Sequence, residues 1–438
     1  MFSSSPFGMK LKELEDKKIL ILGFGREGRD TFKFLRKLFP KRVIGIADRL
    51  EFKNLKLKIK NYKNIRWHLG TNYLKALKNY DVIIKSPGIP IHLPEIEKAF
   101  KRGKITSQTE IFFENCPGKI VGVTGTKGKS TTTSMIYEIL KAGKIKAHLV
   151  GNIGKPVLNL LSSAKPKDVY VYELSSHQLY GLKKNPHITV LLNIYPEHLD
   201  YYRNFKEYAS AKANITLWQT KEGFLVYNSE DKTVKEIAKK SKAKKIPIGG
   251  EYYELDKAAA EAVGELFKIP SKIIEKTLKE FKYLPHRLEL VGTFKGITFY
   301  NDALSTIPET AILAMKTLGK RVQTIFLGGF DRKIDFKNLA KKVLENKNIK
   351  NVILFPTTGE KIWKEIIKQA RGKAVPRHFF IDNMRDAVKL AYQYTQKGKI
   401  CLLSCASTSF SIFRDYKEKG NLFKKQVFAQ AKTKMKMK

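Results

Sequence analysis

The feature that most constrains this chain is the segment at residues 119–133, KIVGVTGTKGKSTTT. An apolar run typical of a buried strand enters a glycine-rich turn, and an apolar pattern of helical period follows. The glycines allow consecutive backbone N–H groups to surround phosphate oxygens, while a lysine and a hydroxyl at the helix start suit the outer phosphates and Mg²⁺. Five residues rather than four separate Gly122 from Gly128, so the spacing departs from the strict Walker pattern. The segment predicts an ATP-binding α/β domain.

The ATP-binding prediction covers the whole glycine-rich turn and the first residues of the helix. These residues are Gly125, Thr126, Lys127, Gly128, Lys129, Ser130, Thr131 and Thr132.

A second glycine-rich turn follows the strand pattern KKILIL near the N-terminus. Its sequence, GFGREG at residues 23–28, has the GxGxxG spacing, and Asp48 stands 20 positions beyond Gly28. That spacing is typical of dinucleotide binding, but the same loop suits any diphosphate, including that of a UDP-sugar. The motif therefore predicts a Rossmann-like fold more firmly than it predicts a ligand. The segment DVIIKSPGIP at residues 81–90 is expected to line the same crevice.

Two further strand patterns end in polar side chains. DVYVYE ends at Glu173, and ITVLLNI runs into the sequence that carries His198. The carboxyl ends of parallel strands meet at one edge of a sheet, so we expect both side chains beside the ATP loop. A carboxylate and an imidazole at that place are candidate metal ligands.

Composition and charge narrow the class of protein. The 438 residues include 84 Lys and Arg against 41 Asp and Glu, a formal net charge of +43. Such an excess suits nucleic acid or an anionic membrane surface, but the lysines are scattered, which favours small anionic substrates. The three cysteines (Cys116, Cys401 and Cys405) form no CxxC pair. No apolar run is long enough for a bilayer and the N-terminus lacks a signal-peptide pattern, so we expect a cytoplasmic protein.

The order of patterns predicts three α/β domains. We expect a Rossmann-like domain at residues 1–107, a P-loop domain with a parallel sheet at 108–318, and a second Rossmann-like domain at 319–438. Segments 284–292 and 297–310 are interpreted as closing the central domain.

Four motifs taken together give the chain a resemblance to the Mur ligases, which form amide bonds with ATP in peptidoglycan synthesis. These motifs are GVTGTKGKST, GNIG, ELSS and PEHLD. Three further stretches extend the resemblance over nearly the whole chain. They are the N-terminal GFGREG, the pair LPHRLE and NDALSTIPE, and the terminal LLS and SFSIFRDYKEKGN. It implies an enzyme that adds glutamate, expected to be D-glutamate, to UDP-N-acetylmuramoyl-L-alanine through an acyl phosphate. It also implies a monomer that uses ATP and two Mg²⁺ ions.

The resemblance assigns roles to individual residues. It implies that Lys129, Glu173, His198 and Lys212 are catalytic, that Lys212 is carbamylated, and that Ser130, Glu173, His198 and Lys212 bind metal. The residues implied to bind the UDP-linked substrate are Gly23, Gly25, Arg26, Glu27, Gly28, Asp48, Arg49, Ser86, Gly88, Asn152 and Ser175. Arg287, Asn301 and Arg332 are implied to contact ATP, and Ser409 and Tyr416 to bind glutamate.

The sequence departs from the family pattern at five positions in or near these motifs, namely Lys127, His177, Leu304, Cys405 and Ser411. Three other interpretations remain open. One is a related ligase that adds glutamate to a folate or to another acceptor. The second is a basic P-loop ATPase that acts on nucleic acid, and the third is an NAD-dependent oxidoreductase suggested only by the loop at 23–28 and Asp48.

Overall fold

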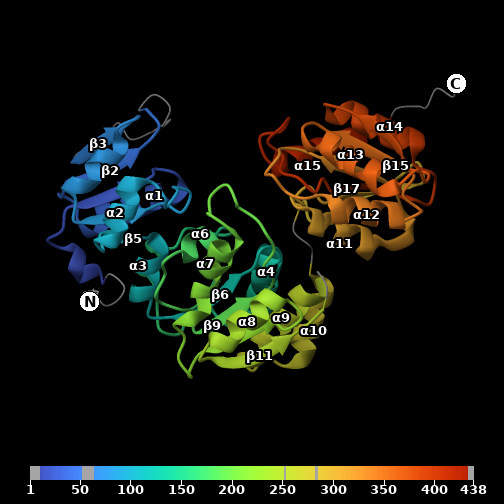
Figure 1. The fold of residues 1–438 in the computed structure, drawn as a ribbon. Helices are drawn as coiled ribbons and strands as arrows, with labels where there is room; N and C mark the ends of the chain where they lie inside the picture. The colour runs from blue at the N-terminus through green and yellow to red at the C-terminus, as the bar shows by residue number, and fades with distance from the viewer. Residues whose placement is uncertain (1–9, 52–63, 251–252, 282–284, 433–438) are drawn as a thin grey trace. The chain divides into compact units, whose positions relative to one another are not determined.

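The computed structural model describes residues 10–51, 64–250, 253–281 and 285–432. The N-terminal residues used to exclude a signal peptide lie outside these ranges, as does Leu284 of the LPHRLE motif. The chain forms two compact units, Met1–Phe281 and Lys282–Lys438 (Figure 1). The first unit contains two parallel sheets and the second contains one mixed sheet. All three sheets are covered by helices, which confirms the predicted α/β class.

The first sheet has the strand order β3-β2-β1-β4-β5, and all its pairs are parallel. Its strands are β1 (Ile19–Leu22), β2 (Ile44–Asp48), β3 (Ile65–Leu69), β4 (Val82–Lys85) and β5 (Ile105–Thr106), with helices α1 (Arg26–Leu38), α2 (Pro94–Lys101) and α3 (Gln108–Asn115) and 3-10 turns η1 (Leu11–Leu14) and η3 (Tyr73–Asn79). Every residue of β1 is buried, as the uniformly apolar run ILIL predicts for a strand covered on both faces.

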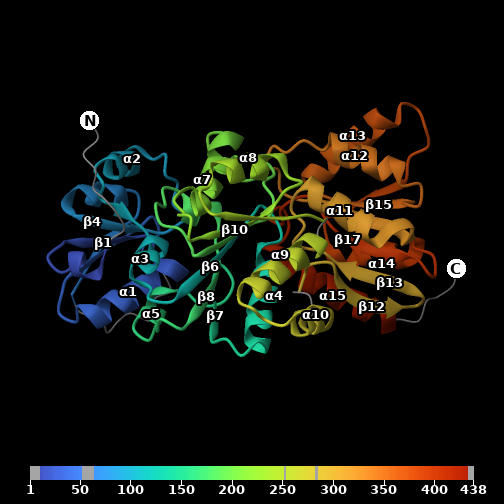
Figure 2. The same ribbon diagram turned by 90° about the horizontal axis from the view of Figure 1, so that it is seen from below.

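The second sheet has the order β11-β10-β9-β6-β8-β7 and is also parallel. Its strands are β6 (Lys119–Thr124), β7 (Ala147–Gly151), β8 (Val169–Glu173), β9 (Ile188–Leu191), β10 (Phe224–Asn228) and β11 (Lys244–Ile248), with helices α4 (Lys129–Ala142), α5 (Leu158–Leu161), α6 (Ser176–Leu179), α7 (Phe205–Leu217), α8 (Lys232–Lys240), α9 (Tyr253–Leu266) and α10 (Ser271–Glu280). Strand β6 lies between β8 and β9, so the loops after these three strands open at one edge. Helix α4 packs against α9 and α10 on one face of the sheet (Figure 2).

The sheet of the second unit has the order β12-β13-β17-β14-β15-β16. Its elements are β12 (Glu289–Phe294), β13 (Ile297–Asn301), α11 (Pro308–Leu318), η4 (Gly319–Arg321), β14 (Val322–Gly328), α12 (Lys337–Glu345), β15 (Asn351–Phe355), α13 (Thr358–Ala370), β16 (Arg377–Phe380), α14 (Met384–Tyr394), β17 (Ile400–Leu403) and α15 (Tyr416–Lys432). The edge pair β12–β13 is antiparallel, whereas the other pairs are parallel.

The structure corrects one predicted boundary. Segment 297–310, interpreted as closing the central domain up to residue 318, instead begins with β13, which pairs with β17 from Thr298–Ile400 to Asn301–Leu403. Ile297 and Phe299 are buried in the same cluster as the apolar residues of β17 and α15. Burial against strands about a hundred positions further along the chain therefore places this segment in the second unit, which the order of motifs does not reveal.

Candidate active site

The ATP loop joins β6 to α4 and is held by the loop that follows β9. Asn193 accepts the Thr126 N–H with its carbonyl at 2.7 Å and the Lys127 N–H with its side-chain oxygen at 2.8 Å. Gly128 has a φ of +93°, and a Cβ there would lie 2.5 Å from the Asp256 carboxylate. Only glycine fits this position, which leads directly into the first turn of α4. A glycine-rich loop that ends at a helix N-terminus is a phosphate site.

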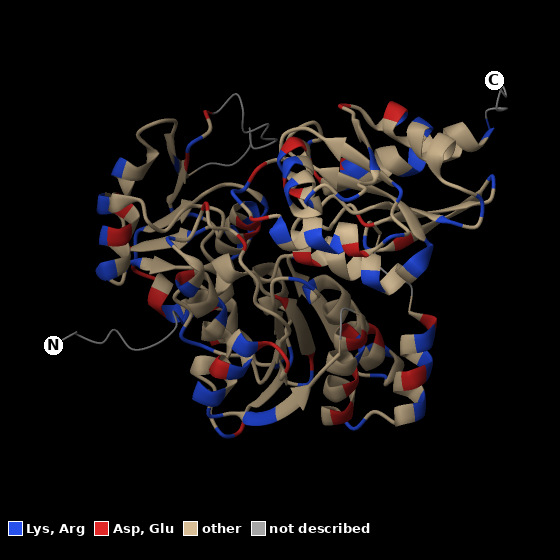
Figure 3. Cartoon of the chain, turned by 45° about the vertical axis from the view of Figure 1, so that its right-hand side comes forward, with Lys and Arg blue, Asp and Glu red and all other residues tan. Residues whose placement is uncertain are grey.

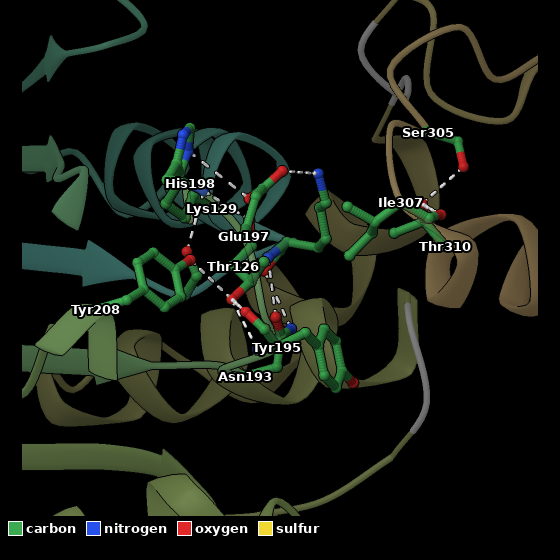
Figure 4. Close-up of polar contacts among 12 residues, drawn as sticks. Thr126, Lys129, Asn193, Tyr195, Glu197, His198, Tyr208, Ser305, Ile307 and Thr310 are labelled. Atoms are coloured by element: carbon green, nitrogen blue, oxygen red, sulfur yellow. Dashed lines mark hydrogen bonds and ion pairs between the residues drawn. The ribbon is translucent and has the colours of Figure 1, made fainter. Parts of the chain in front are cut away.

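Two side chains at the start of α4 are placed for phosphate chemistry. The Lys129 ammonium donates to the carbonyls of Gly125 (3.0 Å) and Thr126 (2.8 Å), and so lies over the loop (Figure 4). The Ser130 hydroxyl donates to the Glu173 carboxylate at 2.8 Å, which brings the end of β8 to the loop as predicted.

Thr131 and Thr132, by contrast, are completely buried, and the Thr132 hydroxyl donates to Asp256 of α9 at 2.8 Å. The buried Thr132 hydroxyl therefore joins α4 to α9. The Thr132 backbone N–H donates to the Gly128 carbonyl at 3.0 Å, within the first turn of α4.

Lys212 lies on α7, is only 2% exposed, and donates to the Gly125 carbonyl at 2.7 Å. Burial lowers the pKa of this lysine well below its ordinary range, and the neighbouring Lys129 ammonium lowers it further. The lowered pKa favours the neutral amine form of Lys212. A neutral amine can react with carbon dioxide to form a carbamate, whereas an ammonium cannot.

A pocket of about 400 Å³ collects side chains from separate motifs of the first unit. Its lining comprises Pro87, Gly88, Lys129, Asn152, Ser175, Ser176, His177, Glu197, His198, Tyr208 and Lys212. Predicted catalytic residues thus share one cavity with residues predicted to hold the UDP-linked substrate. A concave site in which several polar groups converge at strand ends is the expected form of an enzyme centre.

Glu197 and His177 are two of the pocket residues that were not predicted to have a role. Glu197 pairs with Lys127 at 2.8 Å. Burial favours the neutral acid, but Lys127 and then His198 outweigh it and lower the pKa of Glu197 to about 2. His177 packs edge-on against Tyr201 (4.2 Å between ring centres) and His198 (4.8 Å), and burial lowers its pKa to about 3. Glu197 and His177 adjoin predicted residues in the motifs PEHLD and ELSSHQ. That adjacency was the signal by which the sequence could have identified them.

The second glycine-rich turn, the loop at 23–28, is braced from within its own domain. Asp48 accepts the Phe24 N–H at 2.7 Å and the Leu50 N–H at 2.9 Å, and the Ser86 hydroxyl donates to the Gly23 carbonyl at 2.9 Å. A Cβ on Gly28 would lie 2.0 Å from that same carbonyl. Asp48 and Ser86 therefore shape the loop. Gly25 and Gly88 have open space where a side chain would stand.

Three more residues predicted to contact the UDP-linked substrate lie in this loop or at the end of β2. Arg49 is exposed at the end of β2. Arg26 donates to the carbonyls of Asn152, at 3.2 Å, and Gly154. The Glu27 carboxylate accepts the Gln178 amide at 2.8 Å, and burial raises its pKa to about 7. Arg26 and Glu27 thus have partners in the central domain.

In the second unit, Arg287 and Asn301 are buried at the β12–β13 hairpin. The Asn301 amide contacts Glu289 and His286, each at 2.9 Å. The adjacent Asp302 accepts from Ser404 at 2.8 Å, and burial raises its pKa to about 6. These groups form a buried polar cluster that the sequence patterns did not distinguish from a ligand site.

The loops after β14 and β17 carry the residues predicted to contact ATP or glutamate in this unit. A hydrogen bond of 2.8 Å from Phe330 N–H to the Thr408 carbonyl joins the two loops. Arg332 is partly exposed on one, and Ser409 on the other has a buried hydroxyl with no hydrogen-bond partner among the described residues. Tyr416 begins α15 and packs edge-on against His286 at 5.9 Å between ring centres.

The predicted metal ligands fit a magnesium site in part. Ser130 and Glu173 supply adjacent oxygen ligands, the type that Mg²⁺ prefers, and His198 shares the pocket. Within the described residues no three His, Cys, Asp or Glu side chains form a metal cluster by themselves. Phosphate oxygens and a carbamate would have to complete the set. No helix in the described part of the chain is long and apolar enough to cross a membrane.

Comparison with known proteins gives matches along the chain. The family model described as Mur ligase MurD-like, N-terminal domain, matches residues 17–106. The model of the Mur ligase middle domain matches residues 123–295, and that of the Mur ligase glutamate ligase domain matches residues 286–407. The UDP-N-acetylmuramoylalanine–D-glutamate ligase of Acetivibrio thermocellus is 32% identical over 95% of this chain and 97% of its own length. The ligase of the same name from Pediococcus pentosaceus is 33% identical, over 94% of this chain and 97% of its own.

Among solved structures, MurF ligase from Thermotoga maritima in complex with ADP matches 96% of this chain and 97% of its own, with a TM-score of 0.59 and 18% identity. At that identity the match concerns the fold.

Proposed function

Because this chain belongs to the Mur ligase family, we propose that it joins D-glutamate to UDP-N-acetylmuramoyl-L-alanine and consumes ATP. The observation that carries the proposal is the pocket in which Lys129, His198 and Lys212 meet Asn152 and Ser175. The full-length relatives that share about a third of its residues carry this activity in their name. The proposed substrates, ATP and a UDP-linked sugar, place the reaction in the cytoplasm, and we expect the enzyme to act as a monomer.

The reaction we propose has two steps. The alanine carboxylate attacks the γ-phosphate of ATP, which gives an acyl phosphate and releases ADP. The amine of glutamate then attacks the acyl carbon, and the tetrahedral intermediate expels phosphate as the amide forms and the amine loses its proton. Neither step needs a side-chain nucleophile. Both need charge neutralisation and alignment of anionic reactants.

The side chains around the loop supply these functions. The Lys129 ammonium leaves the carbonyls of Gly125 and Thr126 for the transferring phosphoryl group, whose oxygens are stronger acceptors. Ser130 and Glu173 would hold one Mg²⁺, and His198 with Lys212 a second. When bound, Mg²⁺ neutralises charge on the phosphate oxygens.

Lys212 becomes an oxygen ligand only after carbamylation, in which its neutral amine adds to carbon dioxide and releases a proton. Its burial and lowered pKa support this modification. Asn152 and Ser175 would contact the muramoyl-alanine part. In the second unit, Arg332 would contact ATP, whereas Ser409 and Tyr416 would bind glutamate, and the unpartnered Ser409 hydroxyl supports that assignment.

The test is phosphate release from ATP and Mg²⁺ with UDP-N-acetylmuramoyl-L-alanine, with D-glutamate or L-glutamate in separate reactions. We expect release that requires both the UDP-linked acceptor and D-glutamate. Release that requires L-glutamate would correct the amino acid, and release with a folate acceptor would indicate the related ligase. Release stimulated by RNA and independent of the acceptor would overturn the proposal.

The basic residues in Figure 3 occur on helices of both units, interspersed with acidic ones.

A further inference from the structure

The two side chains between the last glycines of the 23–28 loop have partners in another domain. Arg26 bonds to Asn152 and Gly154, in the turn after β7, and Glu27 bonds to Gln178, in α6. We propose that Arg26 and Glu27 are positioning residues, which tie the loop that anchors the UDP end of the acceptor to the two turns that hold its reacting end. This inference rests on the proposed function and assigns a role that diphosphate binding does not require.

The first tie runs through Gln178, which is only 3% exposed. Its amide N–H donates to Glu27 at 2.8 Å, while its carbonyl oxygen accepts the Ser175 backbone N–H at 2.9 Å and the Ser175 hydroxyl at 3.0 Å. Ser175 in turn lines the pocket. Both ends of the Gln178 amide are thus committed, so the position of Ser175 is linked to the 23–28 loop by consecutive hydrogen bonds.

The second tie runs through the turn at 151–154. Asn152 receives Arg26 on its carbonyl at 3.2 Å and donates its own N–H to the Glu173 carbonyl at 3.3 Å. Only glycine allows this close approach, because Gly151 has a φ of +101° and a Cβ there would lie 2.3 Å from the same Glu173 carbonyl. Arg26 therefore reaches the end of β8, where the Glu173 side chain meets the ATP loop.

Both ties end beside the reacting groups, and this has a kinetic consequence. An acceptor anchored at its diphosphate places its carboxylate correctly only if the anchor and the pocket keep a fixed separation. Misplacement by about 1 Å costs about 100-fold in rate. Binding energy from the distant UDP end is then used to align the carboxylate, so loss of the ties lowers kcat rather than the affinity for ATP.

The same domains are also joined at a place remote from the loop, which provides a control. His92 lies between two carboxylates, with Nδ1 3.1 Å from Glu97 and Nε2 3.1 Å from Glu207 at the start of α7. Arg203 donates to Glu97 at 2.7 Å. Loss of this contact weakens the junction between the domains without touching the 23–28 loop.

The experiment compares Glu27→Ala, Arg26→Ala, the conservative Glu27→Gln and the control His92→Phe. Each variant is assayed with UDP-N-acetylmuramoyl-L-alanine and with N-acetylmuramoyl-L-alanine 1-phosphate, which lacks the uridylyl end. We expect Glu27→Ala and Arg26→Ala to lower kcat for the full acceptor about 10- to 100-fold, with the KM for ATP within about twofold of wild type. With the truncated acceptor they should match wild type. Glu27→Gln keeps an acceptor for Gln178 and should retain most of the activity.

Three results would overturn the proposal. Equal losses with both acceptors, as expected for His92→Phe, would mean a merely structural role. A higher KM for the full acceptor with unchanged kcat would mean direct contact with the diphosphate. Wild-type kcat in both alanine variants would mean no role. If the truncated acceptor supports no turnover, the relative changes in kcat and KM for the full acceptor distinguish positioning from direct contact. Arg26 is exposed, so its variant tests the idea even if Glu27→Ala fails to fold. Wild-type turnover reports the proposed function separately.

Discussion

The first unit contains two glycine-rich loops of similar construction and different use. Each follows an inner strand of a parallel sheet, β1 or β6, and leads into the N-terminus of a helix, α1 or α4. In the β6 loop, Lys129 and Ser130 turn toward the loop carbonyls and Glu173. In the β1 loop, Arg26 and Glu27 reach into the neighbouring domain. The glycines suit a phosphate in both cases, and we propose that the side chains decide whether the loop takes part in the chemistry or in positioning the substrate.

The largest effect should come from Lys129, whose ammonium donates to the carbonyls of the β6 loop. Lys129→Ala should lower ADP formation at least about 1,000-fold, because it removes the ammonium that we propose neutralises the transferring phosphoryl group. Urea unfolding should stay within about 1 kcal/mol of wild type. The exposed Lys33→Ala, on the helix after the other loop, is the matched control and should be fully active. Near-normal turnover of Lys129→Ala would remove the distinction between the loops.

Lys212→Ala should be almost as damaging, with loss of about 100- to 1,000-fold, because the variant has no amine to carbamylate. Added short-chain carboxylates should restore part of the activity by supplying the missing oxygens. Lys206→Ala, on the exposed side of the same helix, is the control. Full wild-type activity in buffer free of bicarbonate and carbon dioxide would count against the carbamate.

An intermediate effect is expected at Lys127, which pairs with the buried Glu197 at 2.8 Å. Lys127→Ala leaves that carboxylate without its main counter-charge and should lower the free energy of unfolding by about 2–4 kcal/mol. Adding Glu197→Gln should recover most of the loss, which urea unfolding of the single and double variants would measure. An unchanged unfolding midpoint in Lys127→Ala would show that the pair does not stabilise the ATP loop.

The smallest effect concerns the pH dependence that Glu27 gives to the first unit. Burial raises the pKa of Glu27 from 4.5 to about 7. The folded chain therefore retains a proton that the unfolded chain releases, so this contribution to stability is complete below the unfolded pKa of 4.5 and is lost as pH rises through 7. Since Glu27 is only partly buried, the change is about 1–2 kcal/mol. Glu27→Gln should flatten the pH dependence of urea unfolding between about pH 5 and about pH 8. An unaltered profile would assign the dependence to other groups.

Sequence patterns predicted the three sheets, both glycine-rich loops, and the meeting of Ser130 with Glu173. These features follow from local rules, because a strand, a glycine turn and a helix start are encoded within a few residues. The partners of Arg26 and Glu27 stand 126 and 151 positions further along the chain. No local pattern predicts such contacts, and the same limit explains why β13 was assigned to the wrong unit. The partner of the Thr132 hydroxyl, Asp256, likewise lies on a distant helix.

Helix α7 carries Glu207 near its start and Lys212 five positions later, so one rigid segment joins the His92 contact to the ATP loop. The rise between the two residues is about 7.5 Å, and each residue turns the helix by about 100°. Substitutions between them leave this geometry intact, whereas a one-residue insertion or deletion would rotate Lys212 away from the Gly125 carbonyl. In this stretch the number of residues between Glu207 and Lys212 matters more to the geometry than the identity of those residues. We therefore expect insertions and deletions in related sequences to lie outside it.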